Sequence, residues 1–322
     1  MKILHDVHNH NIFSNCCNDN AASTDAFVAK EVELGNKIFG LSNHIWDESV
    51  KGASGWYSKQ TITKAEEAKA SLAKAPASLK CLFGAESEYF HCHDRVGMSV
   101  EGAKRFDYML IPHSHQHMRN MVLWDLPEIQ EMRAKIAADV KEALPYLAED
   151  TVKTMTNALG EAHLKKYITE QKTDLGKYMA DAAVKSFYDL CANETFIKIC
   201  ATVPTSIAHP FAFCGIPNEI KNSFLINIPD EVLYDCFTKA KAIGAYCEIN
   251  CAAVTEHGMD LEANQLIRVF RNATRAGCQF TFGTDSHSVK SLDIIRVGDT
   301  VADVLGLTKA DIAEYLQDGV EE

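Results

Sequence analysis

Two pairs of residues with metal-binding side chains lie at alternate positions near the two ends of this chain. His8 and His10 close an apolar-leaning run at the N-terminus, and Asp285 and His287 close the run Gln279–Thr284. Because residues i and i+2 of a β-strand point to the same side, each pair can direct two ligands at one point. The two pairs therefore predict a site for more than one metal ion.

Further ligand-type residues follow other strand-like runs. Lys37–Ser42 leads to His44, Leu79–Ala85 to Glu86, Phe106–Pro112 to His113, His115 and His117, Thr205–Ala208 to His209, and Ile243–Cys247 to Glu248 and Asn250. Imidazole and carboxylate groups suit zinc, manganese or iron. So many ligands exceed the roughly four to six that one ion takes, which predicts two or three ions with Glu86 as a bridge. Two ions about 3.5–4 Å apart can acidify a bridging hydroxide and clamp both oxygens in a displacement at phosphorus.

Helical patterns alternate with these strand-like runs. They cover Asp25–Leu34, Thr61–Lys74, Asp230–Ala242 and Asp260–Ala276, and most begin at a capping residue or stop near a glycine. This alternation predicts an α/β fold with a parallel sheet and helices on its outer faces. Seven strands, each with polar residues at its C-terminal end, favour a distorted (β/α)7 barrel over an open sheet.

The stretch from about 120 to 200 differs from the rest. It is polar, helical in pattern, and longer than the dozen or more residues of an ordinary crossover. We interpret it as a helical insertion within a single domain spanning 1–322. It could cover the site or add a helical layer for stability or oligomer contact.

Composition narrows the class of protein. Lys and Arg number 32 against 44 Asp and Glu, a net charge of −12, which argues against a nucleic-acid partner. No apolar run approaches the roughly 18 residues of a membrane span, and no secretory signal precedes the first strand. The 11 cysteines form no C-x-x-C pair, as expected of reduced thiols in the cytoplasm. The expected partner is a small molecule, and the oligomeric state stays open.

The ordered motifs resemble those of the PHP superfamily (polymerase and histidinol phosphatase). They read Asp6-Val-His8-Asn-His10, Ser42-Asn-His44, Gly84-Ala-Glu86, His113-Ser-His115-Gln-His117, Ala208-His209-Pro210 and Gly283-Thr-Asp285-Ser-His287. The resemblance covers the chain except the helical insertion. It implies a distorted (β/α)7 barrel, a two- or three-metal centre, and hydrolysis of a small-molecule phosphomonoester, as in histidinol phosphatases.

The resemblance also implies ligand sets. His8, His10, Glu86 and Asp285 would hold the first ion, His44 and His209 the second, and Glu86, His115 and His287 the third, with catalysis resting on Glu86, His115, Asp285 and His287. Two positions depart from the family pattern. Asn15, Cys16 or Asp19 stands where an Asp or His is usual after His10, and His113, His115 and His117 compete in the fourth motif, with His115 preferred. Glu248-Ile249-Asn250 resembles the family's supporting sixth strand.

The substrate-binding residues are less evident. A phosphate ester favours an arginine, for which Arg95, Arg119 and Arg296 lie near motif ends. His257 could line the mouth of the site, and Trp46 with Trp56 could stack on a substrate or pack their own loop.

Two other classes of function compete with a phosphatase. One is an amidohydrolase-like enzyme that cleaves C–N bonds, although such sites usually need a bridging lysine, and none follows the fourth strand. The other is a non-catalytic metal-binding protein. The sequence leaves the substrate and the metal open.

Overall fold

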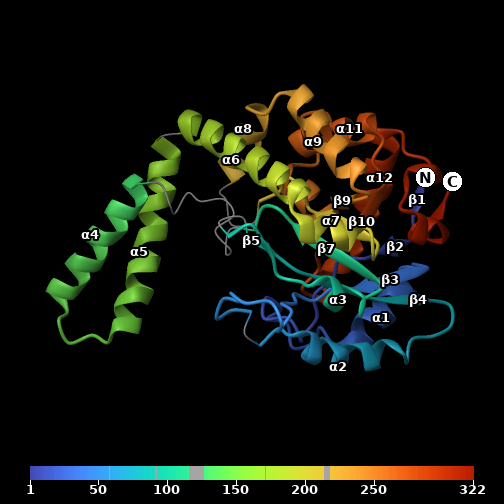
Figure 1. Cartoon of the computed structure of the whole chain (residues 1–322), viewed down its shortest axis with the longest axis horizontal. Coiled ribbons are helices and arrows are strands. Elements are labelled where there is room, and N and C mark those ends of the chain that lie inside the picture. Colours follow the sequence, from blue (N-terminus) through green and yellow to red (C-terminus); the bar gives the residue numbers. More distant parts are fainter. Residues whose placement is uncertain (58, 91–92, 116–126, 171, 214–217) are drawn as a thin grey trace.

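Seven parallel strands form the central sheet, in the order β10–β9–β8–β7–β4–β3–β2 (Figure 1). They are β2 (His5–Asp6), β3 (Ile38–Leu41), β4 (Lys80–Glu86), β7 (Tyr108–Pro112), β8 (Thr205–Ala208), β9 (Tyr246–Asn250) and β10 (Phe280–Gly283). All seven coincide with predicted strand-like runs, shifted by no more than a few residues. This computed structural model describes residues 1–57, 59–90, 93–115, 127–170, 172–213 and 218–322.

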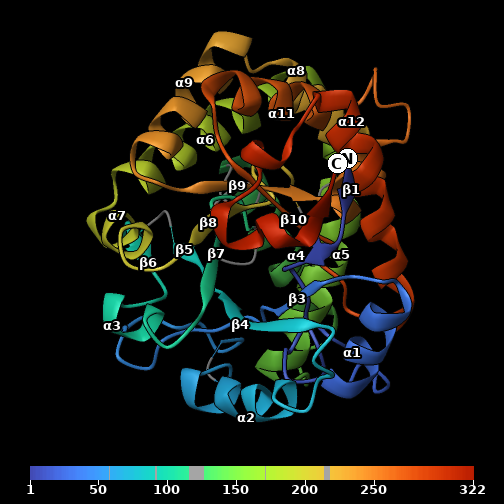
Figure 2. The same ribbon diagram turned by 90° about the vertical axis from the view of Figure 1, so that its right-hand side faces the viewer.

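The sheet closes into a barrel between its first and last strands (Figure 2). The amide of Val7 donates to the Phe282 carbonyl (3.1 Å), and the amide of Asp285 donates to the His8 carbonyl (2.8 Å). Inside the barrel, Tyr108 donates to the Val7 carbonyl (2.7 Å). A Cβ at Gly84 would lie 2.2 Å from the Tyr108 ring, so this strand needs a glycine there. The predicted distorted (β/α)7 barrel is confirmed.

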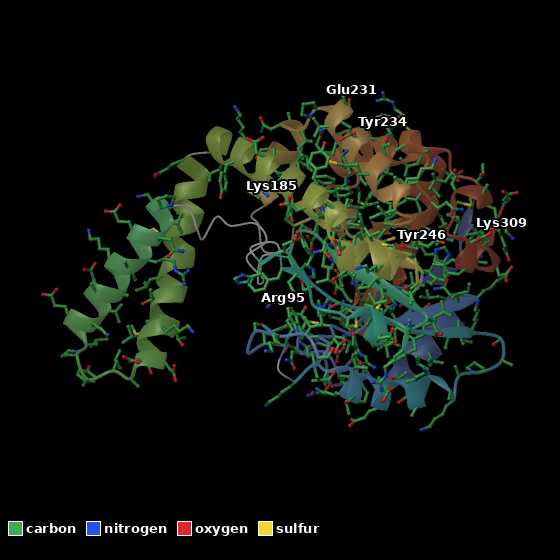
Figure 3. The ribbon with its side chains drawn as sticks, viewed as in Figure 1. Arg95, Lys185, Glu231, Tyr234, Tyr246 and Lys309 are labelled. Atoms are coloured by element: carbon green, nitrogen blue, oxygen red, sulfur yellow. The ribbon has the colours of Figure 1, made fainter. Side chains whose placement is uncertain are left out.

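Helices cover the outside of the barrel. They include α1 (Thr24–Glu33), α2 (Ile62–Leu72), α8 (Asn218–Ile226), α9 (Asp230–Ala242), α10 (Cys251–His257), α11 (Gln265–Ala276) and α12 (Val297–Leu305). Helix α11 begins later than predicted because Asn264 caps it, accepting from the Leu266 amide (2.9 Å). Glu231 and Tyr234 of α9 lie on the outer surface (Figure 3), and both contact Arg275 of α11.

Short elements complete the barrel. Strand β1 (Lys2–Ile3) pairs with β11 (Val320–Glu321), which brings the two termini together (Figure 1), and β5 (Tyr89–Phe90) pairs with β6 (Arg95–Val96). Helix α3 (Val100–Ala103) and the 3-10 helices η4 (Val289–Arg296), η5 (Lys309–Asp311) and η6 (Glu314–Gly319) are further short elements.

Between β7 and β8, most of the residues that the structure describes are helical. This segment contains α4 (Pro127–Ala143), α5 (Glu149–Glu170), α6 (Lys172–Ala192) and α7 (Glu194–Cys200). Helix α6 packs on the barrel, where Phe187 stacks on Phe211 with ring centroids 5.2 Å apart. The α4–α5 hairpin projects away from the barrel and has a small apolar cluster of its own (Figure 1). Among the described residues, no helix has the length and apolar character needed to cross a membrane.

Candidate metal centre

The eight predicted metal ligands converge at the C-terminal ends of the barrel strands. His8 and His10 follow β2, His44 follows β3, Glu86 ends β4, His115 follows β7, His209 follows β8, and Asp285 and His287 follow β10. Six are buried, whereas the side chains of Asp285 and His287 are 19% and 38% exposed. The site is therefore reached from the side of Asp285 and His287.

Glu86 lies at the centre of this group, and its two oxygens face different histidines. Oε1 lies 3.1 Å from His209 Nε2 and 3.4 Å from His115 Nε2. Oε2 lies 3.1 Å from His44 Nδ1 and 3.3 Å from His10 Nε2. A carboxylate that presents one oxygen to each of two ligand sets has the geometry of a bridge between two cations.

Asp285 lies next to His8 and His10, the two histidines that follow β2. Its Oδ1 lies 3.1 Å from His10 Nε2 and 3.5 Å from His8 Nε2, and those two nitrogens are 3.0 Å apart. Asp285 has φ of 54° and His209 has φ of 27°, conformations that non-glycine residues seldom adopt. Such backbone strain is common where a side chain must be directed into a functional site.

Two buried glutamates accept hydrogen bonds from these histidines on the side that faces away from the centre. Glu248 accepts from His8 Nδ1 (2.6 Å) and from the His209 amide (2.5 Å). Glu88 accepts from His115 Nδ1 (2.6 Å) and from the Tyr57 hydroxyl. A proton held on Nδ1 leaves the Nε2 lone pairs of His8 and His115 directed at the centre, as is usual for metal-binding histidines.

The ionised carboxylates among these ligands require positive charge nearby. Burial alone would raise the pKa of Glu86, but the neighbouring His44, His8 and His115 outweigh burial and hold it well below its usual value. Burial would lower the pKa of His8, yet Glu248, Asp285 and Glu86 together hold it well above normal. Glu86 therefore stays ionised, and positive charge must balance it: a proton on His8 in the metal-free protein, or a bound metal ion in its place.

The donor set fits divalent metal ions. Among the described residues there are four groups of three side chains, and within each group the ligand atoms lie within 4.8 Å of one another: His8–His10–Glu86, His44–Glu86–His115, His8–His209–Asp285 and His10–Cys16–His287. Nδ1 of His10 and Nδ1 of His209 are buried and lack a hydrogen-bond partner within the described part of the chain. Imidazole and carboxylate donors in this number suit zinc, manganese or iron.

The histidines group differently from the sets that the family resemblance implies. His209 stacks on His115, with ring centroids 4.7 Å apart and Nε2 atoms 3.0 Å apart, rather than pairing with His44. His287 stacks on His10 at 4.6 Å rather than lying with His115. The order of strands explains both, since β8 is hydrogen-bonded to β7, and β10 adjoins β2 where the barrel closes.

Of the three residues considered after His10, Cys16 lies in the centre. Asn15 instead binds the loop before α2, donating from its side chain to the Trp56 carbonyl (2.6 Å). Asp19 accepts from the Ala21 amide (2.9 Å) and so stabilises its own turn. Burial raises the pKa of the Cys16 thiol to about 12 in the absence of a cation.

The fourth motif directs one of its described histidines to the centre. His115 reaches Glu86, whereas His113 accepts from the Phe211 amide (3.0 Å) and packs among phenylalanines. His117 lies outside the described residues.

The candidate substrate-binding residues have different environments. His257 lines a cavity beside His209 and Asp285, and burial lowers its pKa to about 4. Arg95 donates to the Lys51 carbonyl (2.6 Å), and in Figure 3 it lies at the edge of the main body. Trp46 is buried and donates to the Val50 carbonyl (2.7 Å), which favours a packing role.

Of the other two candidate arginines, the one that the structure describes lies outside the site. Arg296 donates to the carbonyls of Ile3 (2.7 Å) and Leu34 (2.8 Å), so it joins segments of the barrel. Arg119 lies outside the described residues.

Two residues of the site, Tyr57 and Lys221, were missed by sequence reasoning. Tyr57 contacts both His44 and Glu88, but it lies in a loop without a readable pattern. Lys221 on α8 lines the cavity next to Asp285 and pairs with Glu256. Glu88 was not missed: it follows Glu86 at alternate spacing, which makes it a second carboxylate on the same face of the strand and a competitor of Glu86 for the metal.

Comparisons with known proteins support the fold. No family model and no curated protein matches the sequence. Among solved structures, the chain is similar to the histidinol phosphate phosphatase from Lactococcus lactis subsp. lactis Il1403, solved in complex with zinc, L-histidinol and phosphate. The TM-score is 0.53, with 16% sequence identity over 94% of each chain. At this identity, the likeness shows a shared barrel fold.

Proposed function

We propose that this protein is a metal-dependent phosphoesterase that hydrolyses a small-molecule phosphomonoester at a two- or three-metal centre. The observation that carries the proposal is Glu86, whose two oxygens face separate histidine sets within 3.1–3.4 Å. When bound, the ions would supply Lewis acidity toward the phosphoryl oxygens and would activate water for attack on phosphorus.

The residues of the chain supply a preorganised set of ligands. His8, His10, Glu86 and Asp285 would hold one ion, and Glu86 with His115 and His209 would hold a second, following the observed distances. Glu248 and Glu88 fix the orientation of His8 and His115 before substrate binds. Ligands that need no rearrangement stabilise the charge that develops in the transition state.

The organic part of the substrate would occupy the cavity beside Asp285. Its wall includes Asn250, Lys221, Glu256 and His257, which offer an amide, an ammonium, a carboxylate and an imidazole. Lys221 is buried and pairs with Glu256, which keeps its ammonium group in the wall of this cavity. A cavity of this character suits a small polar ester such as histidinol phosphate, the substrate class that the structural neighbour suggests.

The test is phosphate release from a panel of phosphomonoesters that includes histidinol phosphate. The protein is stripped with a chelator and reconstituted separately with zinc, manganese or iron. We expect metal to restore turnover and Asp285→Asn to lower it by about 10²–10³-fold or more, the scale seen when a transition-state stabiliser is removed. Asp303→Asn is the control, because Asp303 is exposed and pairs with the N-terminal amine.

Two results would contradict the proposal. One is the absence of phosphate release with every metal from protein that demonstrably binds two or three ions, which would turn attention to C–N substrates or to a non-catalytic role. The other is turnover that survives Asp285→Asn unchanged.

A further inference from the structure

One corner of the centre contains a sulfur ligand. The ligand atoms of Cys16, His10 and His287 lie within 4.8 Å of one another. On a tetrahedral zinc ion, a sulfur and a nitrogen ligand would be about 3.5 Å apart, given Zn–S and Zn–N bonds of about 2.3 and 2.0 Å. The three residues are therefore close to a metal-binding arrangement before any ion is bound.

Barrel closure brings these residues together. Cys16 lies in the loop after β2, whereas His287 follows β10, and the His10 amide donates to the Ser286 carbonyl (2.9 Å). The two segments are more than 250 residues apart in sequence. Their juxtaposition depends on pairing between the first and last strands.

The neighbouring Cys17 does not take the same role. Its sulfur donates to the His287 carbonyl (3.1 Å), outside the group of ligand atoms. His287 itself donates from Nδ1 to the Asp285 carbonyl (2.8 Å), which leaves its Nε2 lone pair for a metal. Cys16 and His287 thus present a sulfur and a nitrogen donor to the same small space.

We propose that Cys16 binds a zinc ion as a thiolate, at a position that it forms with His287 beside His10. The proposal rests on the metal centre of the proposed function, and it gives one position of that centre a sulfur ligand. Thiolate is a soft ligand that selects zinc, whereas a site of only nitrogen and oxygen ligands also accepts manganese. The centre therefore contains one position that prefers zinc or cobalt, next to positions that accept harder ions.

The test uses cobalt(II) as a spectroscopic substitute for zinc. Metal-stripped full-length protein is titrated with cobalt, and absorbance is recorded together with bound cobalt per chain by mass spectrometry. Wild type is expected to show a thiolate-to-cobalt charge-transfer band in the near ultraviolet. Cys16→Ser is expected to lose the band, whereas the matched control Cys17→Ser keeps it.

A second variant separates loss of the sulfur from loss of the fold. Cys16→Asp replaces the thiolate with a hard carboxylate, so it is expected to bind cobalt without the charge-transfer band and to accept manganese more readily. Circular dichroism of each stripped variant checks that the barrel is retained.

Each possible result decides the question. Cobalt bound without a charge-transfer band in wild type, or a band that persists in Cys16→Ser, would overturn the role of Cys16 while leaving the metal centre intact. If wild type binds no cobalt, zinc or manganese at all, the proposed function fails together with this inference.

Discussion

The clearest test of the site's construction is the substitution Glu248→Gln. Glu248 is buried in β9 and accepts from His8 Nδ1 (2.6 Å) and from the His209 amide (2.5 Å). Its own oxygens are not among the grouped ligand atoms, so the substitution removes no proposed ligand. Glutamine keeps the shape of the side chain but loses the charge and one acceptor oxygen.

The size of the effect follows from these two contacts. A hydrogen bond to a charged group contributes about 1.5–3 kcal/mol, and each 1.36 kcal/mol is a tenfold change in an equilibrium constant. Loss of one such bond therefore predicts affinity for the ion at His8 that is lower by about 10–100-fold, the range typical of residues that orient metal ligands.

The assay is zinc binding to stripped protein in competition with a chromophoric chelator at constant pH. Glu31→Gln is the matched control, because Glu31 is also a buried glutamate but lies on α1, where it pairs with Asn36 just beyond the end of the helix. Thermal unfolding of the stripped proteins separates weaker binding from lower stability. An unchanged zinc affinity in Glu248→Gln, equal to that of Glu31→Gln, would refute the view that this carboxylate orients His8.

Two further predictions concern the barrel around the centre. Burial lowers the pKa of His5 from 6.5 to about 4, so the folded state binds fewer protons than the unfolded state between these values. Its stabilising contribution is complete above pH 6.5 and is lost as pH falls toward 4, by about 3 kcal/mol in total. Urea unfolding at several pH values should show this loss of unfolding free energy in wild type relative to His5→Gln. Burial raises the pKa of Asp6 to about 6, which changes stability with pH in the opposite direction, but this change is common to both proteins. Parallel plots of unfolding free energy against pH for the two proteins would contradict the prediction. Separately, a Cβ at Gly283 would lie 2.3 Å from His8 Cβ and 2.7 Å from Glu248 Oε1, so Gly283→Ala should cost about 1–3 kcal/mol of stability and weaken zinc binding. Gly55→Ala, where nothing lies within 4 Å of the new Cβ, should do neither in the same denaturation and chelator-competition assays, and equal behaviour of the two variants would show that the close approach is unimportant.

The strands and the ligands that follow them could be predicted from local sequence. Alternate spacing of His8 and His10, and of Asp285 and His287, identifies two side chains on one face because the period of a β-strand is a property of the backbone itself. Helix ends were predictable where a cap or a glycine marks them, as in α9, which spans the predicted Asp230–Ala242. The later start of α11 depends on the particular cap at Asn264.

The partners of each ligand could not be predicted in the same way. His115 and His209 stack because β7 and β8 are adjacent, and Cys16 approaches His287 because β10 closes on β2. The outer contacts of Glu88 and Lys221 likewise join residues from different elements. The spacing of residues within either segment does not predict any of these pairings.

The sequence by itself therefore determined the class of fold, the seven strands and the kinds of side chain that end them. Only the tertiary structure decided which ligands share a neighbour, which of Asn15, Cys16 and Asp19 enters the centre, and that the α4–α5 hairpin projects from the barrel. The physical reason is that periodicity and capping act within a few residues of the chain. The order of strands and the closure of a barrel instead depend on packing between segments that are distant in sequence.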